Sequence, residues 1–175
     1  QSTRGFPKKS YDFDFNPGYK FRWSEDAPRV GDLNLLTTWA DKALMRHILA
    51  YETYRDAGAP AHFAFPVRVQ QNRNFYSVAN VVESGDDDFL NRLGLDPQGA
   101  LYKMYNSAES VANAEKKTRK TEGTADLQAL INGMSQANIT SRRAFMHDNL
   151  DLPEIIDFLA AKIITADVDC CHKNY

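Results

Sequence analysis

Cysteine, charge of a single sign and long apolar runs are scarce in this sequence. Its only cysteines are an adjacent pair, Cys170 and Cys171. Adjacent cysteines rarely bridge each other, because the ring they would close strains the peptide between them, and two thiols without a second pair make a poor zinc site. We interpret them as small loop residues, so the pair predicts neither a disulfide framework nor a metal centre.

The overall charge does not favour two classes of partner. The net charge is −2, with 21 basic and 23 acidic side chains, so nothing in the total favours nucleic acid or a membrane surface. No apolar run approaches the roughly 18 residues of a membrane-spanning helix, so we expect no transmembrane segment. The 175 residues, 43% hydrophobic and 25% charged, are typical of a soluble globular domain with one well-buried core.

The first hundred residues mainly predict strands. Aromatic and acidic residues alternate from Tyr11 to Phe15, which predicts a strand with one buried face. Residues 31–36 are expected to be a short apolar link. Residues 63–69 and 75–82, separated by Gln71-Asn72-Arg73-Asn74, predict a hairpin, and residues 101–105 predict a further short strand.

One long helix interrupts these strands. Thr37 and Thr38 are its N-cap candidates, and it is expected to run for about 20 residues to Ala57, where Gly58 closes it. Its predicted buried stripe consists of Leu44, Met45, Ile48, Leu49 and Ala50. A short helix is expected near residues 89–93.

The second half predicts helices at 126–136, at 141–149 and from Asp151 or Leu152 onward, the last with Pro153 just inside its start. That last helix has a clear 3.6-residue period formed by Ile155, Ile156, Leu159, Ala160, Ile163 and Ile164. Residues 107–123 are polar and carry a cluster of basic side chains, which are Lys116, Lys117, Arg119 and Lys120. We interpret that segment as a solvated helix or a mobile insertion, with a substrate-docking patch as the alternative.

Strands followed by helices, with a linker near residues 83–88 and no internal repeat, predict an α+β fold. The outline is that of a truncated, protein-kinase-like bilobal fold, with a strand-rich N-terminal lobe and a helical C-terminal lobe. Its expected parts are residues 1–83 with strands and the long helix, residues 84–106 as linker and short strand, and the helical residues 107–175.

The chain ends in a pattern that suits phosphoryl transfer. Asp169 and Asn174 follow the amphipathic helix with the D-x-x-x-x-N spacing of a kinase catalytic loop. There the aspartate accepts the proton of the attacking hydroxyl, and the asparagine holds Mg²⁺ on the phosphates. The alternative is that Asp169 caps a turn and Asn174 satisfies backbone groups.

Further upstream, several charged residues could face a nucleotide. Lys8 and Lys9 lead into the first strand, and a lysine there can reach nucleotide phosphates if an acid such as Glu52 holds it. The alternatives are an exposed strand edge and a surface glutamate. Glu83 and Lys103 could line the same cleft, although Glu83 could equally be a strand-end carboxylate in solvent.

Seven segments, in order, resemble the CotH-type spore-coat kinase family. They are residues 2–11, Asp32 to Leu36, the helix around Met45-Arg46 and Ala50 with Ala57 to Pro60, the hairpin ending in Val82-Glu83, Phe89-Leu90 with Leu101-Tyr102-Lys103, Asp157 to Ala160, and Asp169 to Tyr175. Similarity is low around residues 107–125. The chain departs from the family at the hairpin, where glycines are replaced by Asn72-Arg73-Asn74-Phe75-Tyr76-Ser77-Val78-Ala79. Because glycine permits backbone conformations that other residues rarely adopt, the sequence with these replacements does not predict the geometry of the turn.

The resemblance implies an atypical kinase that transfers phosphate from ATP, with Mg²⁺, to serine or threonine of a spore-coat or secreted protein, at an extracellular or spore-surface location. It implies Asp169 as the catalytic aspartate and Asn174 as a metal ligand. The implied nucleotide-binding residues are Arg4 in the loop over the phosphates, Lys8 with Lys9 as its alternative, Glu83 and Lys103. Glu52 joins this predicted set only as the acid placed on the long helix to hold the lysine. The family's earlier strands and later metal-binding aspartates are expected outside residues 1–175, so we expect little phosphotransfer from this chain alone. Two alternatives remain, a non-catalytic surface or spore-coat adhesin on the same fold and a phosphotransferase for a small molecule.

Overall fold

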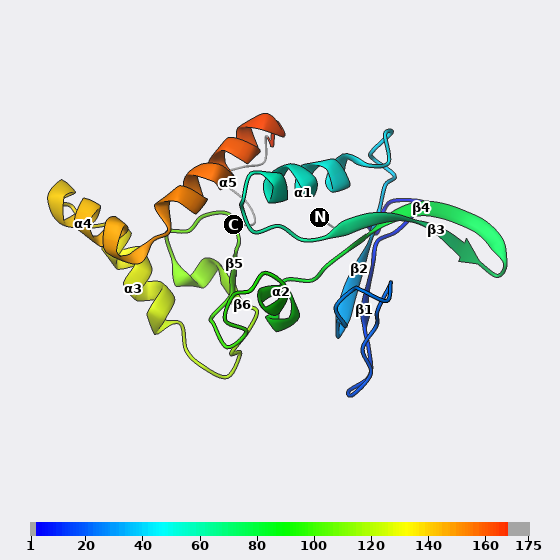
Figure 1. The fold of residues 1–175 in the computed structure, drawn as a ribbon, viewed down its shortest axis with the longest axis horizontal. Helices are drawn as coiled ribbons and strands as arrows, with labels where there is room; N and C mark the ends of the chain where they lie inside the picture. The colour runs from blue at the N-terminus through cyan, green and yellow to red at the C-terminus, as the bar shows by residue number, and fades with distance from the viewer. Residues whose placement is uncertain (1–2, 168–175) are drawn as a thin grey trace. The chain divides into compact units, whose positions relative to one another are not determined.

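The computed structural model describes residues 3–167 and contains both helices and antiparallel sheet, so the fold is α+β (Figure 1). It divides into two compact units. The first comprises residues 1–56 and 60–97, and the second comprises residues 57–59 and 98–175. Asp169, Asn174 and both cysteines lie outside the described residues.

A four-stranded antiparallel sheet forms the first unit. Its strands are β1 (Tyr11–Asp14), β2 (Asp32–Thr37), β3 (Ala64–Gln71) and β4 (Asn74–Val82), in the order β1-β2-β4-β3. Residues 31–36 were expected to be a link, and that expectation is wrong because β2 pairs along both of its edges. The sequence signal for this strand is weak, because the adjacent Leu35 and Leu36 interrupt the alternation of apolar and polar residues that indicates a strand.

The predicted first strand is confirmed as β1, but its predicted buried face is wrong. All four residues are exposed, and Tyr11 and Phe13 are each 43% exposed. β1 lies at the sheet edge and pairs with β2 alone, so its aromatic side chains gain little cover.

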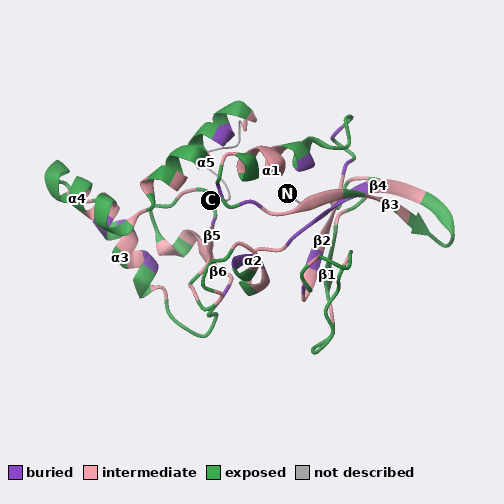
Figure 2. Ribbon diagram, viewed as in Figure 1, coloured by how far each residue is buried: buried purple, intermediate pink, exposed green. Residues whose placement is uncertain are grey.

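The hairpin of β3 and β4 is confirmed. Asn72 and Arg73 both take positive φ angles, 52° and 66°, as the two central residues of a type I′ turn require. The turn therefore closes without the family's glycines. Burial is concentrated at the other end of β4, where the residues from Ala79 to Val82 are all buried (Figure 2).

The long helix α1 spans Arg46–Asp56, so it begins well after the predicted start. Asp41 supplies the cap instead of Thr37 or Thr38, since its carboxylate accepts the backbone N–H of Ala43 at 3.0 Å and of Arg46 at 2.8 Å. Gly58, at φ +88°, follows the helix as expected. Of the predicted stripe only Ile48 is buried. Leu44 and Met45 precede the helix, Leu49 within it is 51% exposed, and Ala50 is half-buried.

The short helix α2 spans Asp87–Arg92 and is capped by Asp86, whose Oδ1 accepts the N–H of Phe89 at 3.1 Å. Its buried residues are Phe89 and Leu90. The predicted helix near residues 89–93 is confirmed, with an earlier start.

In the second unit, β5 (Tyr102–Met104) pairs with β6 (Ala114–Lys116), and the one-turn helix η1 (Val111–Asn113) precedes β6. A solvated helix or mobile insertion at residues 107–123 is therefore wrong. The sequence missed β6 because it has only three residues, two of which, Glu115 and Lys116, are charged. Met104, Leu127 and Ile131 form the buried cluster of this unit.

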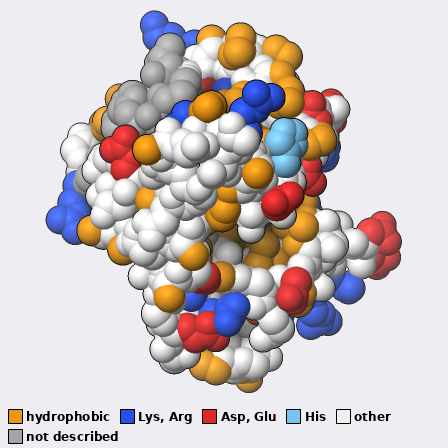
Figure 3. All heavy atoms as spheres, turned by 90° about the vertical axis from the view of Figure 1, so that its left-hand side faces the viewer, with side chains coloured by type: hydrophobic (Ala, Val, Ile, Leu, Met, Phe, Trp, Pro, Cys, Tyr) orange, Lys and Arg blue, Asp and Glu red, His pale blue; other side chains and the backbone are white. Residues whose placement is uncertain are grey.

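The three predicted helices of the second unit are confirmed as α3 (Ala125–Met134), α4 (Ile139–Asn149) and α5 (Leu152–Ile164). The apolar stripe of α5 is largely exposed, since only Ala161 and Lys162 of this helix are buried. Its exposed apolar residues are Ile155, Ile156, Leu159, Ile163 and Ile164. Hydrophobic side chains also stand among charged ones on the surface in Figure 3. None of the helices described for residues 3–167 has the length and apolar character that crossing a bilayer requires.

Candidate functional site

The predicted site residues fall into three groups. Asp169 and Asn174 lie outside the described residues, so their roles stay predictions. Five others belong to the first unit, namely Arg4, Lys8, Lys9, Glu52 and Glu83. Lys103 belongs to the second unit, on β5, with its Nζ 5.1 Å from the centre of the Tyr105 ring.

Lys8 fastens the N-terminal segment to β4. Its Nζ donates a hydrogen bond to the carbonyl of Tyr76 and lies 4.1 Å from the centre of the Tyr76 ring. The Tyr76 hydroxyl in turn donates to the carbonyl of Pro7 at 3.2 Å. Lys8 is consequently half-buried, whereas Lys9 is exposed.

The structure does not bring the first-unit candidates together. Among the described residues, neither Lys8 nor Lys9 forms an ion pair with Glu52, which lies half-buried on α1. Tyr76, which holds Lys8, and Glu83 are seven residues apart along β4 and its end, or about 23 Å at the rise of a strand. Arg4 is exposed in a turn closed by the bond from Phe6 N to the Thr3 carbonyl, at 2.9 Å.

The first unit does hold one well-built polar site, around Glu83. Its Oε1 accepts Nε of Arg92 at 2.7 Å, and its Oε2 accepts Nη2 of Arg92 at 2.6 Å and the N–H of Phe63 at 3.3 Å. Arg92 Nη2 also donates to the carbonyl of Ala61 at 2.7 Å. Glu83 is only 3% exposed, so the alternative of a carboxylate in solvent is wrong.

Aromatic rings surround this ion pair. The Arg92 guanidinium lies 5.8 Å from the centre of the Phe63 ring and 5.6 Å from that of Phe89. The Trp23 ring packs on Phe63 with 4.0 Å between centroids, and His62 packs on Phe89 at 4.6 Å. Low polarity and the two partners together hold Arg92 in one geometry.

The electrostatics follow from this burial. Burial raises the pKa of Glu83, and the hydrogen bonds from Arg92 oppose that shift. Burial and the positive charge of Arg92 lower the pKa of His62 to about 4, so that imidazole is neutral at physiological pH. Because both Glu83 oxygens are engaged, this site can fix the backbone between β4 and α2, where the sequence predicts the linker.

Sequence reasoning missed Arg92 and His62. The sequence does show an acid at the end of a strand and an arginine at the end of the next helix, but nothing local pairs them. Their pairing depends on how α2 folds back on the end of β4, which is a tertiary property.

The aspartates that precede and open α2 carry a second set of charges. Asp88 accepts Lys20 Nζ at 2.7 and 2.9 Å and the N–H of Gly31 at 3.0 Å. Burial, together with the charges of Asp32, Asp88 and Asp87, raises the pKa of Asp86 to about 6. Within residues 3–167, however, no group of three carboxylate, histidine or cysteine side chains is arranged to hold a metal ion.

The basic cluster of the second unit is largely neutralised. Lys116 has a side chain only 8% exposed, and its Nζ lies 3.7 Å from Asp126 and 4.0 Å from Glu122. Lys117 pairs with Glu115 at 2.9 Å, and Arg119 Nε pairs with Glu122 at 2.8 Å. These internal pairs argue against the alternative of a basic substrate-docking patch.

Comparisons with known proteins test the family resemblance found in the sequence. No match was found among curated proteins. A family model described as "CotH kinase protein" matches residues 1–175. The match includes residues 107–125, where the similarity noted in the sequence is low. The resemblance is therefore confirmed, and the chain belongs to the CotH kinase family.

Proposed function

We propose that this chain is part of an ATP-dependent kinase that transfers phosphate to serine or threonine of a protein on a spore coat or outside the cell. The observation that carries the proposal is the family match over residues 1–175. In the proposal Asp169 accepts the proton of the attacking hydroxyl. Phosphoryl transfer depends mainly on positioning the two substrates and on neutralising the charge of the phosphates, and the protein need not form a covalent intermediate.

The arrangement within each unit supports a kinase-like bilobal fold. The first unit is an antiparallel sheet with α1 inserted between β2 and β3, and the second carries α3, α4 and α5. In protein kinases a lysine on the strand preceding such a helix pairs with a glutamate of that helix. β2, with the sequence DLNLLT, has no lysine, so the phosphate-facing cation must come from another segment.

Lys8 and Lys9 are the proposed cations, and Arg4 is proposed to cover the phosphates. Lys9 is exposed and forms no hydrogen bond or ion pair with the residues from 3 to 167, so it can turn toward a ligand without losing a contact. Lys8 would first have to release the carbonyl of Tyr76. Glu52, Glu83 and Lys103 complete the proposed nucleotide-binding set, with Glu83 acting through the backbone that it fixes.

Magnesium would neutralise charge on the ATP phosphates, and Asn174 is its proposed ligand in this chain. The described residues contribute no cluster of metal ligands, so the metal assignment rests on Asn174. Loss of Asn174 should therefore weaken metal-dependent nucleotide binding, whereas loss of Asp169 should affect proton transfer.

The experiment compares Asp169→Ala with Asp167→Ala in the full-length protein, following transfer of labelled phosphate from ATP to protein. Asp169→Ala should lower transfer about 10²- to 10⁴-fold and leave nucleotide binding nearly unchanged. Asp167 is the matched control, because its carboxylate pairs with Lys162 at 3.4 Å on α5. Equal activity of the Asp169→Ala and Asp167→Ala proteins would contradict the proposal.

A second candidate is a non-catalytic surface or spore-coat adhesin on the same fold. It is favoured by the contacts that already occupy Lys8 and Glu83, two residues proposed to serve the nucleotide. A thermal-shift experiment on the full-length protein separates the two functions. Stabilisation by ATP with magnesium supports the kinase, and its absence supports the adhesin.

A further inference from the structure

The segment before β1 concentrates positive charge. Residues 3–10 contain Arg4, Lys8 and Lys9 and no acidic residue. The nearest acid along the chain is Asp12 on β1, and none of the ion pairs within residues 3–167 joins it to either lysine. The two lysines are therefore cations that a phosphate-bearing ligand can attract.

Hydrogen bonds at both ends close this segment into a loop. The Thr3 hydroxyl accepts the N–H of Ser10 at 3.0 Å, and the Thr3 carbonyl accepts the N–H of Phe6 at 2.9 Å. The Ser10 hydroxyl accepts the N–H of Thr37 at 3.1 Å, which fixes the loop to the end of β2. Because none of these bonds involves residues 7–9, the middle of the loop can move while its ends stay in place.

Tyr76 of β4 holds the middle of this loop. Its carbonyl accepts Lys8 Nζ, its ring centre lies 4.1 Å from that nitrogen, and its hydroxyl donates to the carbonyl of Pro7 at 3.2 Å. Lys8 is thus half-buried against two neutral partners, a carbonyl and a ring. Because an ammonium group binds a phosphate more strongly than a neutral carbonyl, an anion that reaches Lys8 can draw it away from Tyr76.

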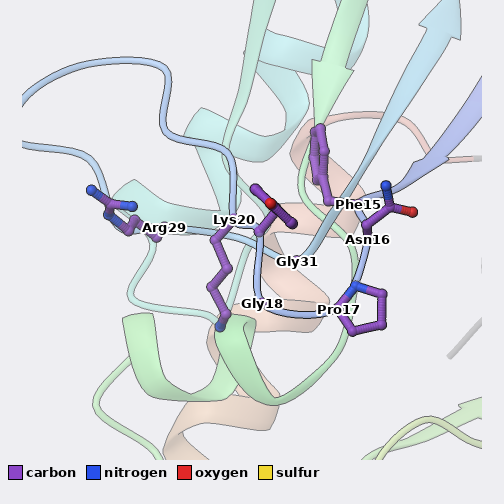
Figure 4. Close-up of a pocket in the computed structure, with 8 residues that line it drawn as sticks. Phe15, Asn16, Pro17, Gly18, Lys20, Arg29 and Gly31 are labelled. Carbon is purple, nitrogen blue, oxygen red and sulfur yellow. The ribbon is translucent and has the colours of Figure 1, made fainter.

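Lys20 is a lysine of the same unit that is held differently. It lines an open depression beside Pro17 and Gly18 (Figure 4), and its Nζ donates to the two carboxylate oxygens of Asp88 at 2.7 and 2.9 Å. The hydrogen bond to Asp88 raises the pKa of Lys20, and the carboxylate neutralises its charge. An anion therefore gains little by approaching Lys20, whereas Lys8 has no acidic partner within residues 3–167 to compete with that anion.

We propose that Lys8 and Tyr76 form a latch that ATP releases. In the free protein Tyr76 holds Lys8 and the middle of the loop against β4, and the phosphates of bound ATP draw Lys8 off the Tyr76 carbonyl. The loop then carries Lys8 to the phosphates, while the bonds of Thr3 and Ser10 keep its ends in place. The part played by ATP rests on the proposed function, whereas the hold of Tyr76 on Lys8 does not.

The first experiment measures, without nucleotide, how fast each lysine amine of the full-length protein is acetylated, with mass spectrometry as the readout. Lys9 is the internal reference, because it is exposed and forms no hydrogen bond or ion pair with residues 3–167. Lys8 should react at least about fivefold more slowly than Lys9, because its amine is hydrogen-bonded. Tyr76→Ala should bring the two rates within about twofold, since it removes the ring and the bond to Pro7.

Two variants of β4 are the controls for this experiment. Phe75→Ala removes the neighbouring ring, which is 58% exposed, and should leave the Lys8 rate within about twofold of the unchanged protein. Tyr76→Phe keeps a ring beside Lys8 and should retain most of its protection. Equal rates for Lys8 and Lys9 in the unchanged protein, or the same loss of protection in Phe75→Ala as in Tyr76→Ala, would overturn the latch.

The second experiment adds ATP with magnesium to the full-length Tyr76→Ala protein. The phosphates should now protect Lys8 from acetylation and leave the Lys9 rate within about twofold, and the Kd for ATP should be at least about fivefold lower than that of the unchanged protein, because ATP has less to displace. Protection of Lys9 alone, or equal Kd values, overturns release by ATP. Absence of ATP binding in both proteins contradicts the proposed function, and the rates measured without nucleotide then still decide whether Tyr76 holds Lys8.

Discussion

β4 of the first unit and α5 of the second place their apolar residues in opposite environments. The end of β4 from Ala79 to Val82 is buried, although its letters include an asparagine. α5 has a regular apolar stripe, yet Ile163 is 81% and Ile156 63% exposed. Burial thus depends on which elements pack against a strand or helix, and a regular apolar period in its sequence does not ensure it.

The two units also use their charged residues differently. The first unit buries one bidentate pair, Glu83 with Arg92, among aromatic rings. The second unit ties residues 115–126 together by several pairs at or near the surface, such as Arg119 with Glu122. Buried pairs are costly to break singly, whereas exposed pairs contribute little each.

The largest expected effect comes from Glu83→Ala. It leaves the Arg92 guanidinium between Phe63 and Phe89 without its counter-charge, so the free energy of unfolding should fall by about 3 kcal/mol or more. Urea unfolding followed by tryptophan fluorescence measures this, because Trp23 and Trp39 both belong to the first unit.

Arg55→Ala is the control for that experiment, since Arg55 pairs with Asp56 at the surface. Both side chains are more than half exposed, at 64% and 73%, and we expect a change below about 0.5 kcal/mol. Similar midpoints for Glu83→Ala and Arg55→Ala would remove the distinction between the two kinds of ion pair.

The next effect compares two isoleucines of the second unit. Ile131→Ala should lower the free energy of unfolding by about 2–4 kcal/mol, because it empties space beside Met104 and Leu127. Ile163→Ala should change it by less than about 0.5 kcal/mol, because Ile163 is 81% exposed. Denaturation followed by helical circular dichroism measures both, and equal losses would mean that the α5 stripe is covered in solution.

A smaller effect, of opposite sign, is expected at Asn80. Its side chain is fully buried, and neither Oδ1 nor Nδ2 has a hydrogen-bond partner. Asn80→Leu should raise the free energy of unfolding by about 1–2 kcal/mol, because it removes two unsatisfied polar atoms. Asn34→Leu is the comparison, because Asn34 Nδ2 donates a hydrogen bond to the Ser84 hydroxyl at 2.9 Å. Losing this bond should make the Asn34→Leu variant less stable than the unchanged protein. Destabilisation by both substitutions alike would show that Asn80 has a partner in solution.

The smallest effect is a pH dependence with opposite signs in the two units. Burial raises the pKa of Asp86 to about 6, so folding favours its protonated form, and the stability it contributes declines as pH rises from about 4 to 6. Asp86→Asn keeps the cap of α2 and should be more stable than the unchanged protein at pH 7, by about 1 kcal/mol after allowing for partial exposure.

Asp126 is the counterpart in the second unit. The hydrogen bond from Tyr102 lowers its pKa, so it contributes stability above its ordinary pKa that is lost as pH falls through the lowered value. Relative to the unchanged protein, Asp86→Asn should therefore gain stability in unfolding measurements as pH rises from about 4 to 6, whereas Asp126→Asn should lose stability as pH rises from the lowered pKa of Asp126 to its ordinary value. Parallel slopes would refute the assignment.

Sequence reasoning predicted the elements that have strong local signals. It failed for elements whose position depends on contacts with other parts of the chain. The hairpin of β3 and β4 and the helices α3 to α5 have clear periods or turn and cap residues. β2 was missed because its own alternation is imperfect and its pairing with β4 joins segments that are distant in sequence, and β6 was missed because it has only three residues, two of them charged. The start of α1 was misplaced because Asp41, five residues before Arg46, competes successfully for the cap.

For the candidate site, the sequence alone determined which residue types occur and in what order, and this order is sufficient to place the chain in its family. It also determined the caps and turns, because those bonds join residues within a few positions. Only the tertiary structure decided that Glu83 binds Arg92, that Lys8 is held by Tyr76 and that Lys116 is neutralised by Asp126. Whether a charge is free or paired depends on long-range packing, which residue order does not specify.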